Sequence, residues 1–181
     1  MKKIFSVMML CLCCMAFVSC ETKEEEYTGN KFKSCIFQGR PEFSEDILNL
    51  YDITVTYTAM DGTTKVMTPG EDGTIPFIDE STTLPATMKM VMKAVKKPTF
   101  DEYINSHEDF DLIAFIPRVE ARYSTVAEGE KVLFQAGKLY ALGVSRELAL
   151  AFLEEDLFPQ MNFTIEGTFT KTNSGCDFIK K

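Results

Sequence analysis

Apolar and polar residues alternate with a period of two in several parts of this chain. The clearest run covers 161–170, where Met161, Phe163 and Ile165 alternate with Asn162, Thr164 and further polar residues. Successive side chains of a β-strand point to opposite faces, so this spacing predicts a strand that is buried on one face and exposed on the other. The same alternation in 51–59 predicts a second such strand.

Other segments extend this strand set. The further predicted strands cover 31–38, 63–68, 87–97, 112–123 and 131–142. Asp61-Gly62 lies between two of the strands and predicts a tight hairpin, because both residues tolerate a positive φ.

Met88, Met90 and Met92 share one face of the strand predicted for 87–97. A methionine stripe can form an adaptable binding surface or a thioether metal site. Because the spacing is that of a strand's inner face, we expect these side chains to lie in the core.

Helical signals are few. Thr99 and Glu102 have the spacing of a capping box and predict a short helix ending near Ser106. A second short turn is expected at 44–47, and 145–156 is rich in good helix formers. Short strands separated by turns predict a mainly β domain, an antiparallel β-sandwich of immunoglobulin-like or transthyretin-like form with one or two short helices.

The amino-terminal segment has the layout of a signal peptide over residues 1–19. Lys2 and Lys3 precede an uncharged run, which ends at the small residue Ser19. The run is too short for a transmembrane helix, which needs about 20 apolar residues. The sequence Phe17-Val18-Ser19-Cys20 resembles the cleavage site of bacterial lipoproteins, although Phe17 stands where leucine is usual. The resemblance implies lipidation of Cys20 and anchoring in a lipid bilayer; the alternative is an ordinary secretory peptide and a soluble periplasmic protein.

Residues 20–30 form a charged tether before the predicted domain at 31–181. Lys23 followed by three glutamates resembles the export signal of surface lipoproteins in the Bacteroidota. That resemblance implies exposure on the surface of the outer membrane. The alternative is a solvated spacer, since like charges repel one another and extend the chain.

The charge of the chain excludes one class of partner. The formal net charge is −8, and loss of Lys2 and Lys3 with the signal peptide would make it −10. Affinity for nucleic acid comes largely from clustered cations, so we expect no nucleic-acid partner. An acidic surface also opposes electrostatic adhesion to anionic lipids.

Cys35 and Cys176 are the cysteines that follow Cys20. In an oxidising compartment they could form a disulfide that stabilises the fold by about 4–5 kcal/mol in the chain-entropy model. The alternative is a pair of buried free thiols, which pack as small apolar groups.

The sequence contains no recognisable catalytic constellation. His107 lies among acidic residues, but the spacing matches no known calcium loop and fixes no second metal ligand. Ser145 lacks the second glycine of a nucleophile elbow and is expected to cap a helix. We therefore expect no metal, no cofactor and no enzymatic activity.

These observations predict a non-enzymatic binding or structural module at the cell envelope, with a protein or glycan as a further partner. The loops expected to make contact are 69–85 and 98–111, with Tyr103, Tyr123 and Tyr140 as contact residues. Three alternatives remain: a carbohydrate-binding accessory of an outer-membrane uptake system, a fimbria-like adhesin subunit, and a hydrolase with paired carboxylates.

Overall fold

The computed structural model describes residues 32–126, 129–173 and 175–181. The predicted signal peptide, Cys20 and the tether lie outside these residues. The strands are β1 (Phe32–Gly39), β2 (Glu42–Phe43), β3 (Tyr51–Thr58), β4 (Thr64–Met67), β5 (Phe77–Ser81), β6 (Ala86–Lys96), β7 (Asp109–Thr125), β8 (Gly129–Ser145), β9 (Phe163–Thr172) and β10 (Gly175–Lys180). The helical elements are α2 (Glu45–Leu50), α3 (Phe100–Ser106), α4 (Arg146–Phe152), a π-helical turn (Leu153–Leu157) and α5 (Phe158–Gln160).

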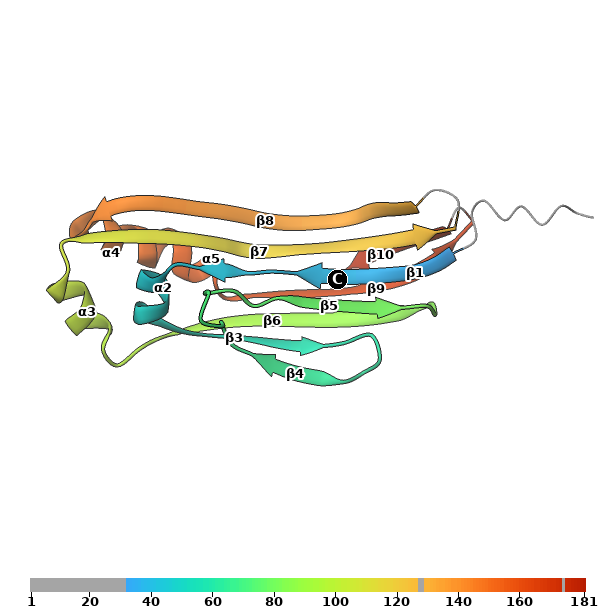
Figure 1. The fold of residues 1–181 in the computed structure, drawn as a ribbon, viewed down its shortest axis with the longest axis horizontal. Coiled ribbons are helices and arrows are strands. Elements are labelled where there is room, and N and C mark those ends of the chain that lie inside the picture. Colours follow the sequence, from blue (N-terminus) through green and yellow to red (C-terminus); the bar gives the residue numbers. More distant parts are fainter. Residues whose placement is uncertain (1–31, 127–128, 174) are drawn as a thin grey trace, which may run out of the picture.

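Two antiparallel sheets face each other and confirm the predicted β-sandwich (Figure 1). The first sheet contains β5, β1, β7 and β8 in that order, and β2 pairs with β7 beyond the end of β1. The second sheet has the order β10-β9-β6-β3-β4. The helices gather at one end of the sandwich, where α2 and α4 pack against β7 (Figure 1).

The alternating segments form strands close to the expected positions. Asp61-Gly62 makes the hairpin between β3 and β4, with φ of +84° at Gly62 and the backbone N–H of Thr63 donating to Asp61 Oδ1 at 2.8 Å. Three strands were not expected, and the two-residue strand β2 is one of them. β5 lies inside 69–85, which was predicted as a loop, and β10 follows β9 at the carboxyl end.

The inner faces of the two sheets form one hydrophobic core. Met88, Met90 and Met92 are completely buried, which confirms their predicted core position. The ring of Phe178 on β10 packs against that of Phe169 in its own sheet and against that of Phe37 in the first sheet, so it links the two sheets.

The helices differ from the expectation in extent and in capping. The described residues hold three helical stretches at the three places that the sequence indicated, against one or two short helices expected for the domain, and the last is longer than expected since α4, the π-helical turn and α5 run on from 146 to 160. Thr99 and Ser145 occupy N-cap positions, but neither side chain makes a capping hydrogen bond. The predicted capping box is therefore not formed, and packing holds these short helices: Phe100 and Ile104 of α3 are buried.

Candidate functional site

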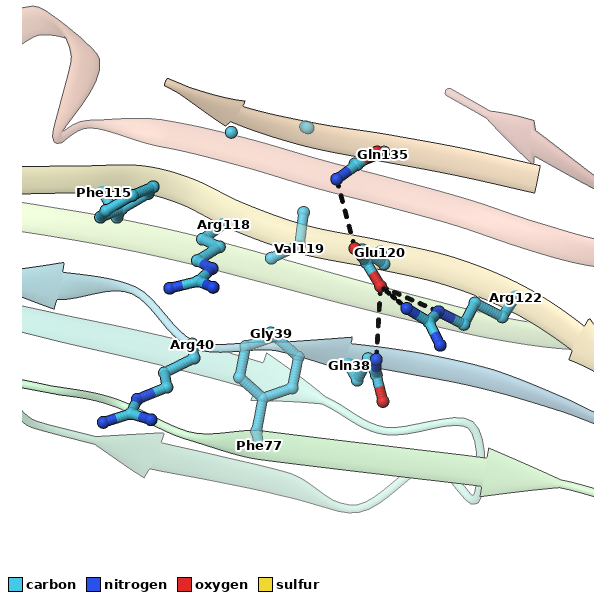
Figure 2. Close-up of a pocket in the computed structure, with 12 residues that line it drawn as sticks. Gln38, Gly39, Arg40, Phe77, Phe115, Arg118, Val119, Glu120, Arg122 and Gln135 are labelled. Carbon is cyan, nitrogen blue, oxygen red and sulfur yellow. Dashed lines mark hydrogen bonds and ion pairs between the residues drawn. The ribbon is translucent and has the colours of Figure 1, made fainter. Parts of the chain in front are cut away.

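A groove of about 790 Å³ opens on the outer face of the first sheet (Figure 2). Its volume lies within the range of roughly 300–1,000 Å³ that is usual for small-ligand sites. We call it the arginine groove, and it is lined by Gln38, Gly39, Arg40, Phe77, Phe115, Arg118, Val119, Glu120, Arg122, Gln135, Ala136 and Gly137.

An interruption of the sheet creates this groove. Pairing between β7 and β8 shifts between Ile116 and Val119, so that Pro117 and Arg118 lie opposite Gly137. Proline has no N–H to donate to the ladder, and an extra residue bends the strand locally. A Cβ at Gly137 would lie 3.0 Å from the carbonyl oxygen of Pro117, so glycine suits this close approach.

The neighbouring strand breaks at the same level. β1 ends at Gly39, and β2 resumes the pairing with β7 at Glu42. The backbone N–H of Arg40 donates to the Arg118 carbonyl at 2.9 Å and ties the two interruptions together. Arg40, which follows β1, therefore lies beside Arg118 of β7.

Glu120 forms the centre of a hydrogen-bonded cluster at one end of the groove (Figure 2). The carboxylate accepts from Arg122 Nε at 2.8 Å, from Gln38 Nε2 at 3.3 Å and from Gln135 Nε2 at 3.2 Å. These donors come from β1, β7 and β8. Arg122 also donates to Glu130 at 3.1 Å. Its hydrogen bonds to Glu120 and Glu130 raise the pKa of the Arg122 guanidinium above its usual value.

The other two arginines of the groove, Arg40 and Arg118, make longer ion-pair contacts than Arg122 does. Arg40 lies 3.5 Å from Asp72, and Arg118 lies 3.8 Å from Glu42. The guanidinium of Arg118 stacks over the Phe115 ring, 4.8 Å from its centroid. Each arginine side chain is more than half exposed, so most of its N–H donors face solvent.

The composition of the groove contrasts with that of the chain. The protein has four arginines and three glutamines, and its net charge is −8. Three of those arginines and two of those glutamines line this one groove. Arginine presents a planar fork of donors that fits carboxylate and related anions. The groove is therefore suited to a polar ligand that carries negative charge.

The two cysteines of the domain lie in the core as free thiols. Burial raises the pKa of Cys35 to about 12 and that of Cys176 to about 11. Cys35 Sγ lies 3.8 Å from the sulfur of Met60 and 3.6 Å from the carbonyl oxygen of Ser81. Both thiols are therefore poor nucleophiles at neutral pH.

His107 directly follows α3 and contacts the last turn of that helix. Its Nδ1 lies 2.9 Å from the carbonyl oxygen of Tyr103, and the imidazole stacks on the Tyr103 ring with centroids 4.2 Å apart. Among the described residues, no three His, Cys, Asp or Glu side chains come together in a way that could hold a metal ion. Ser145 stands at the start of α4, as expected, without a capping hydrogen bond from its side chain.

The tyrosines expected to make contacts are structural. Tyr123 and Tyr140 are 6% exposed, so their prediction as contact residues was wrong. Tyr103 Oη donates to Asp46 at 2.7 Å, which fastens α3 to α2. The prediction failed because the inner or outer orientation of an isolated tyrosine depends on the neighbouring layer as well as on its strand.

The contact regions predicted from sequence also differ from the observed groove. Residues 98–111 form α3 and the start of β7, and 69–85 contributes Phe77 at the rim. The arginines of the groove were missed. The signal that could have found them is Pro117 inside an alternating run, because a proline there indicates a bulge beside Arg118.

Comparison with known proteins gives no further identification. No family model matches the chain, and neither the curated proteins nor the solved structures contain a significant match. Within the described part of the chain, every helix is too short or too polar to cross a bilayer.

Proposed function

We propose that this protein is a non-enzymatic binding module, anchored at the cell envelope through a lipid on Cys20, and that the arginine groove is its ligand-contact surface. The observation that carries this proposal is the gathering of three of the four arginines in one groove of an acidic protein. Structural needs explain it poorly, because exposed ion pairs contribute little stability, about 0–1 kcal/mol each.

The arrangement of the groove supports binding rather than catalysis. Its carboxylate, Glu120, already accepts hydrogen bonds from three side chains. A general acid or base needs an oxygen that is free to exchange a proton with the substrate. Glu120 instead fixes Gln38, Gln135 and Arg122 in position, as expected of a preorganised binding surface.

A glycan-array and pull-down screen with the detergent-solubilised protein tests the binding role. We expect a retained glycan or protein partner, and we expect Gln135→Ala to lose it because the Gln135 amide projects into the groove. Thr56→Ala, on the outer face of the second sheet, is the matched control and should retain the partner. Equal retention by both variants would place binding elsewhere on the protein.

Anchoring is tested separately by labelling cells with a radioactive fatty acid. The wild-type protein should carry the label and the Cys20→Ala variant should not, because the acyl chains attach at that residue. Protease treatment of intact cells then distinguishes a surface location from one facing the periplasm. An unlabelled wild-type protein would remove the lipid anchor from the proposal.

A second candidate function is assembly through an exposed strand. β8 has 17 residues, and in the described structure β7 is its strand partner, so β8 lies at an edge of the first sheet (Figure 1). Leu139 and Leu142 on β8 are 51% and 37% exposed. A long edge strand with apolar side chains can pair with a strand from another chain.

Light scattering over a range of protein concentrations tests this second candidate. Assembly through β8 predicts a mass that rises with concentration and falls back to one chain in Leu139→Lys. Charged residues at an edge oppose pairing between sheets. A single-chain mass at all concentrations would exclude self-assembly through this strand.

A further inference from the structure

Arg40 and Arg118 place two positive charges side by side at one end of the arginine groove (Figure 2). The backbones of the two residues are joined directly, since the Arg40 N–H donates to the Arg118 carbonyl at 2.9 Å. Like charges at neighbouring positions of a sheet are destabilising. An anion held between the two guanidinium groups would offset that repulsion.

The nearby carboxylates do not fill this role. Asp72 Oδ1 accepts from the backbone N–H of Thr74 at 3.1 Å and from its hydroxyl at 2.9 Å, so it is held within its own turn. These Thr74 hydrogen bonds, the side-chain one foremost, lower the pKa of Asp72. Its contact with Arg40 is long at 3.5 Å, and Glu42 lies farther still from Arg118, at 3.8 Å. Both guanidinium forks therefore keep donors for a ligand.

The end of the groove formed by Gln38, Glu120 and Gln135 is suited to a different ligand group. Glu120 carries negative charge there, and Gln38 and Gln135 donate to it through their amide nitrogens. The amide oxygens of these glutamines are hydrogen-bond acceptors, which suit ligand hydroxyl groups. A ligand that matches the whole groove thus carries an anionic group at one end and hydroxyl donors at the other.

A peptide meets these requirements less well than a sugar. The groove lies on a sheet face, where the backbone groups of β1 and β7 are paired on both sides in the ladders, and the free edge of β8 is the side that faces away from β7. Recognition of an extended peptide by strand addition needs a free edge. The side chains that line the groove are available instead, and they complement a polyhydroxylated ring with a carboxylate.

We infer that the arginine groove binds an acidic polysaccharide, with the carboxylate of a uronic acid held between Arg40 and Arg118 and ring hydroxyls facing Gln38 and Gln135, which Glu120 holds in position. This inference rests on the proposed binding function and names its ligand class. Arginine forks bind carboxylates through paired, charge-assisted hydrogen bonds, and these set the specificity for the charged sugar.

Affinity electrophoresis of the detergent-solubilised protein in gels containing polygalacturonate tests the inference. We expect the wild-type protein to be retarded, and added salt to weaken the retardation. Arg118→Gln and Arg40→Gln should each weaken binding about tenfold or more, because each removes a charge-assisted contact of about 1.5–3 kcal/mol. Lys65→Gln makes the same charge change on an exposed strand of the second sheet and should leave binding unchanged.

Two further polymers identify the group that is recognised. Fully methyl-esterified polygalacturonate keeps the sugar chain but lacks the charge, and should not retard the protein. Poly-L-glutamate keeps the carboxylates but lacks ring hydroxyls, and should bind much more weakly than polygalacturonate. Unfolding curves of each variant confirm that lost binding does not arise from lost structure.

The outcomes separate this inference from the proposed function. Equal retardation by the esterified polymer, or stronger retardation by poly-L-glutamate, overturns the uronate assignment. If the retardation by the esterified polymer or by poly-L-glutamate is lost in Gln135→Ala, the groove remains the binding surface and the proposed function stands. If no polymer retards the protein and the array and pull-down screen are also negative, both proposals fail.

Discussion

The outer faces of the two sheets have the same origin and different shapes. Both arise from strands that alternate buried and exposed residues. The second sheet carries a mainly polar outer surface, on which the hydroxyl oxygens of Thr87 and Thr168 lie 3.0 Å apart and Lys89 pairs with Glu166 at 3.3 Å. The first sheet carries the arginine groove, with Glu120 at the centre of bonds from three strands.

The regularity of the ladders explains the difference. Among the described residues, pairing in the second sheet shows no register shift. Pairing of β7 in the first sheet shifts at Ile116/Val119 and again at Ala121/Arg122. Alternation by itself therefore produces a mainly polar outer face, and the arginine groove lies where the ladder of the first sheet is interrupted. This comparison leads to three predictions, given in order of decreasing effect.

Met90→Ala should cause the largest loss of stability. Met90 is completely buried in β6, where it pairs with Tyr57 of β3 and Ile165 of β9. Truncating a buried methionine removes apolar contacts and leaves a cavity, at a cost of about 2–5 kcal/mol. Chemical denaturation monitored by circular dichroism measures the change in the free energy of unfolding.

The control for this prediction is Lys93→Ala, an exposed position of the same strand. It should change the free energy of unfolding by less than about 0.5 kcal/mol. If Met90→Ala were equally mild, the methionine stripe would not be part of the packed core. Ligand binding by the folded fraction should be unaffected in both variants, because neither residue lines the arginine groove.

Two glycines, one in each sheet, sharpen the comparison. A Cβ at Gly39 would lie 2.7 Å from the Arg118 carbonyl oxygen, and a Cβ at Gly167 would lie 2.1 Å from the ring of Phe178. Alanine at either position should lower the free energy of unfolding by about 1–3 kcal/mol, through overpacking. Only Gly39→Ala should also weaken ligand binding, because it displaces the backbone of Arg118.

Gly143→Ala is the matched control, since a Cβ there meets nothing within 4 Å. Its free energy of unfolding should stay unchanged or rise by up to about 1 kcal/mol, because alanine restricts the unfolded chain. Denaturation curves and affinity electrophoresis measure both properties for all three variants. Equal binding by Gly39→Ala and Gly167→Ala would contradict the role of the interruption in shaping the groove.

The smallest expected effect concerns the thiols, one from each sheet, in alkaline solution. Their pKa values rise from an ordinary value of 9.0 to about 12 for Cys35 and about 11 for Cys176. Above pH 9 the unfolded chain loses these protons before the folded protein does. The free energy of unfolding should therefore fall as pH rises, by about 1 kcal/mol per thiol between pH 9 and 10. The loss should continue to about pH 11 for Cys176 and to about pH 12 for Cys35.

Denaturation curves between pH 8 and pH 10 measure this dependence. The double variant Cys35→Ala/Cys176→Ala should show a shallower fall than the wild-type protein. The buried tyrosines Tyr51 and Tyr57, whose pKa values are also raised by burial, contribute to the fall that remains. Titration of thiols in the unfolded protein completes the test: no free thiol would mean that Cys35 and Cys176 are joined in a disulfide.

Much of the sandwich could be predicted from local patterns. The strands at 51–59, 87–97 and 161–170 were found because one face of each is buried against the opposite sheet. β5 was missed since it lies at a sheet edge and its burial pattern has no fully buried position. β10 was missed as well, at the edge of the second sheet. Edge strands show a weaker alternation of apolar and polar residues, because they have fewer neighbours to bury their side chains.

The sequence by itself determined the class of the fold, the inner positions of the methionine stripe and the turn at Asp61-Gly62, because each depends on residues close together along the chain. Only the tertiary structure decided the candidate site. Arg40 and Arg118 are 78 positions apart in the numbering, and they become neighbours through the pairing of β1 with β7 and the bulge at Pro117. The physical reason is that strand pairing and register are long-range properties, set by packing of the whole sandwich rather than by any one segment.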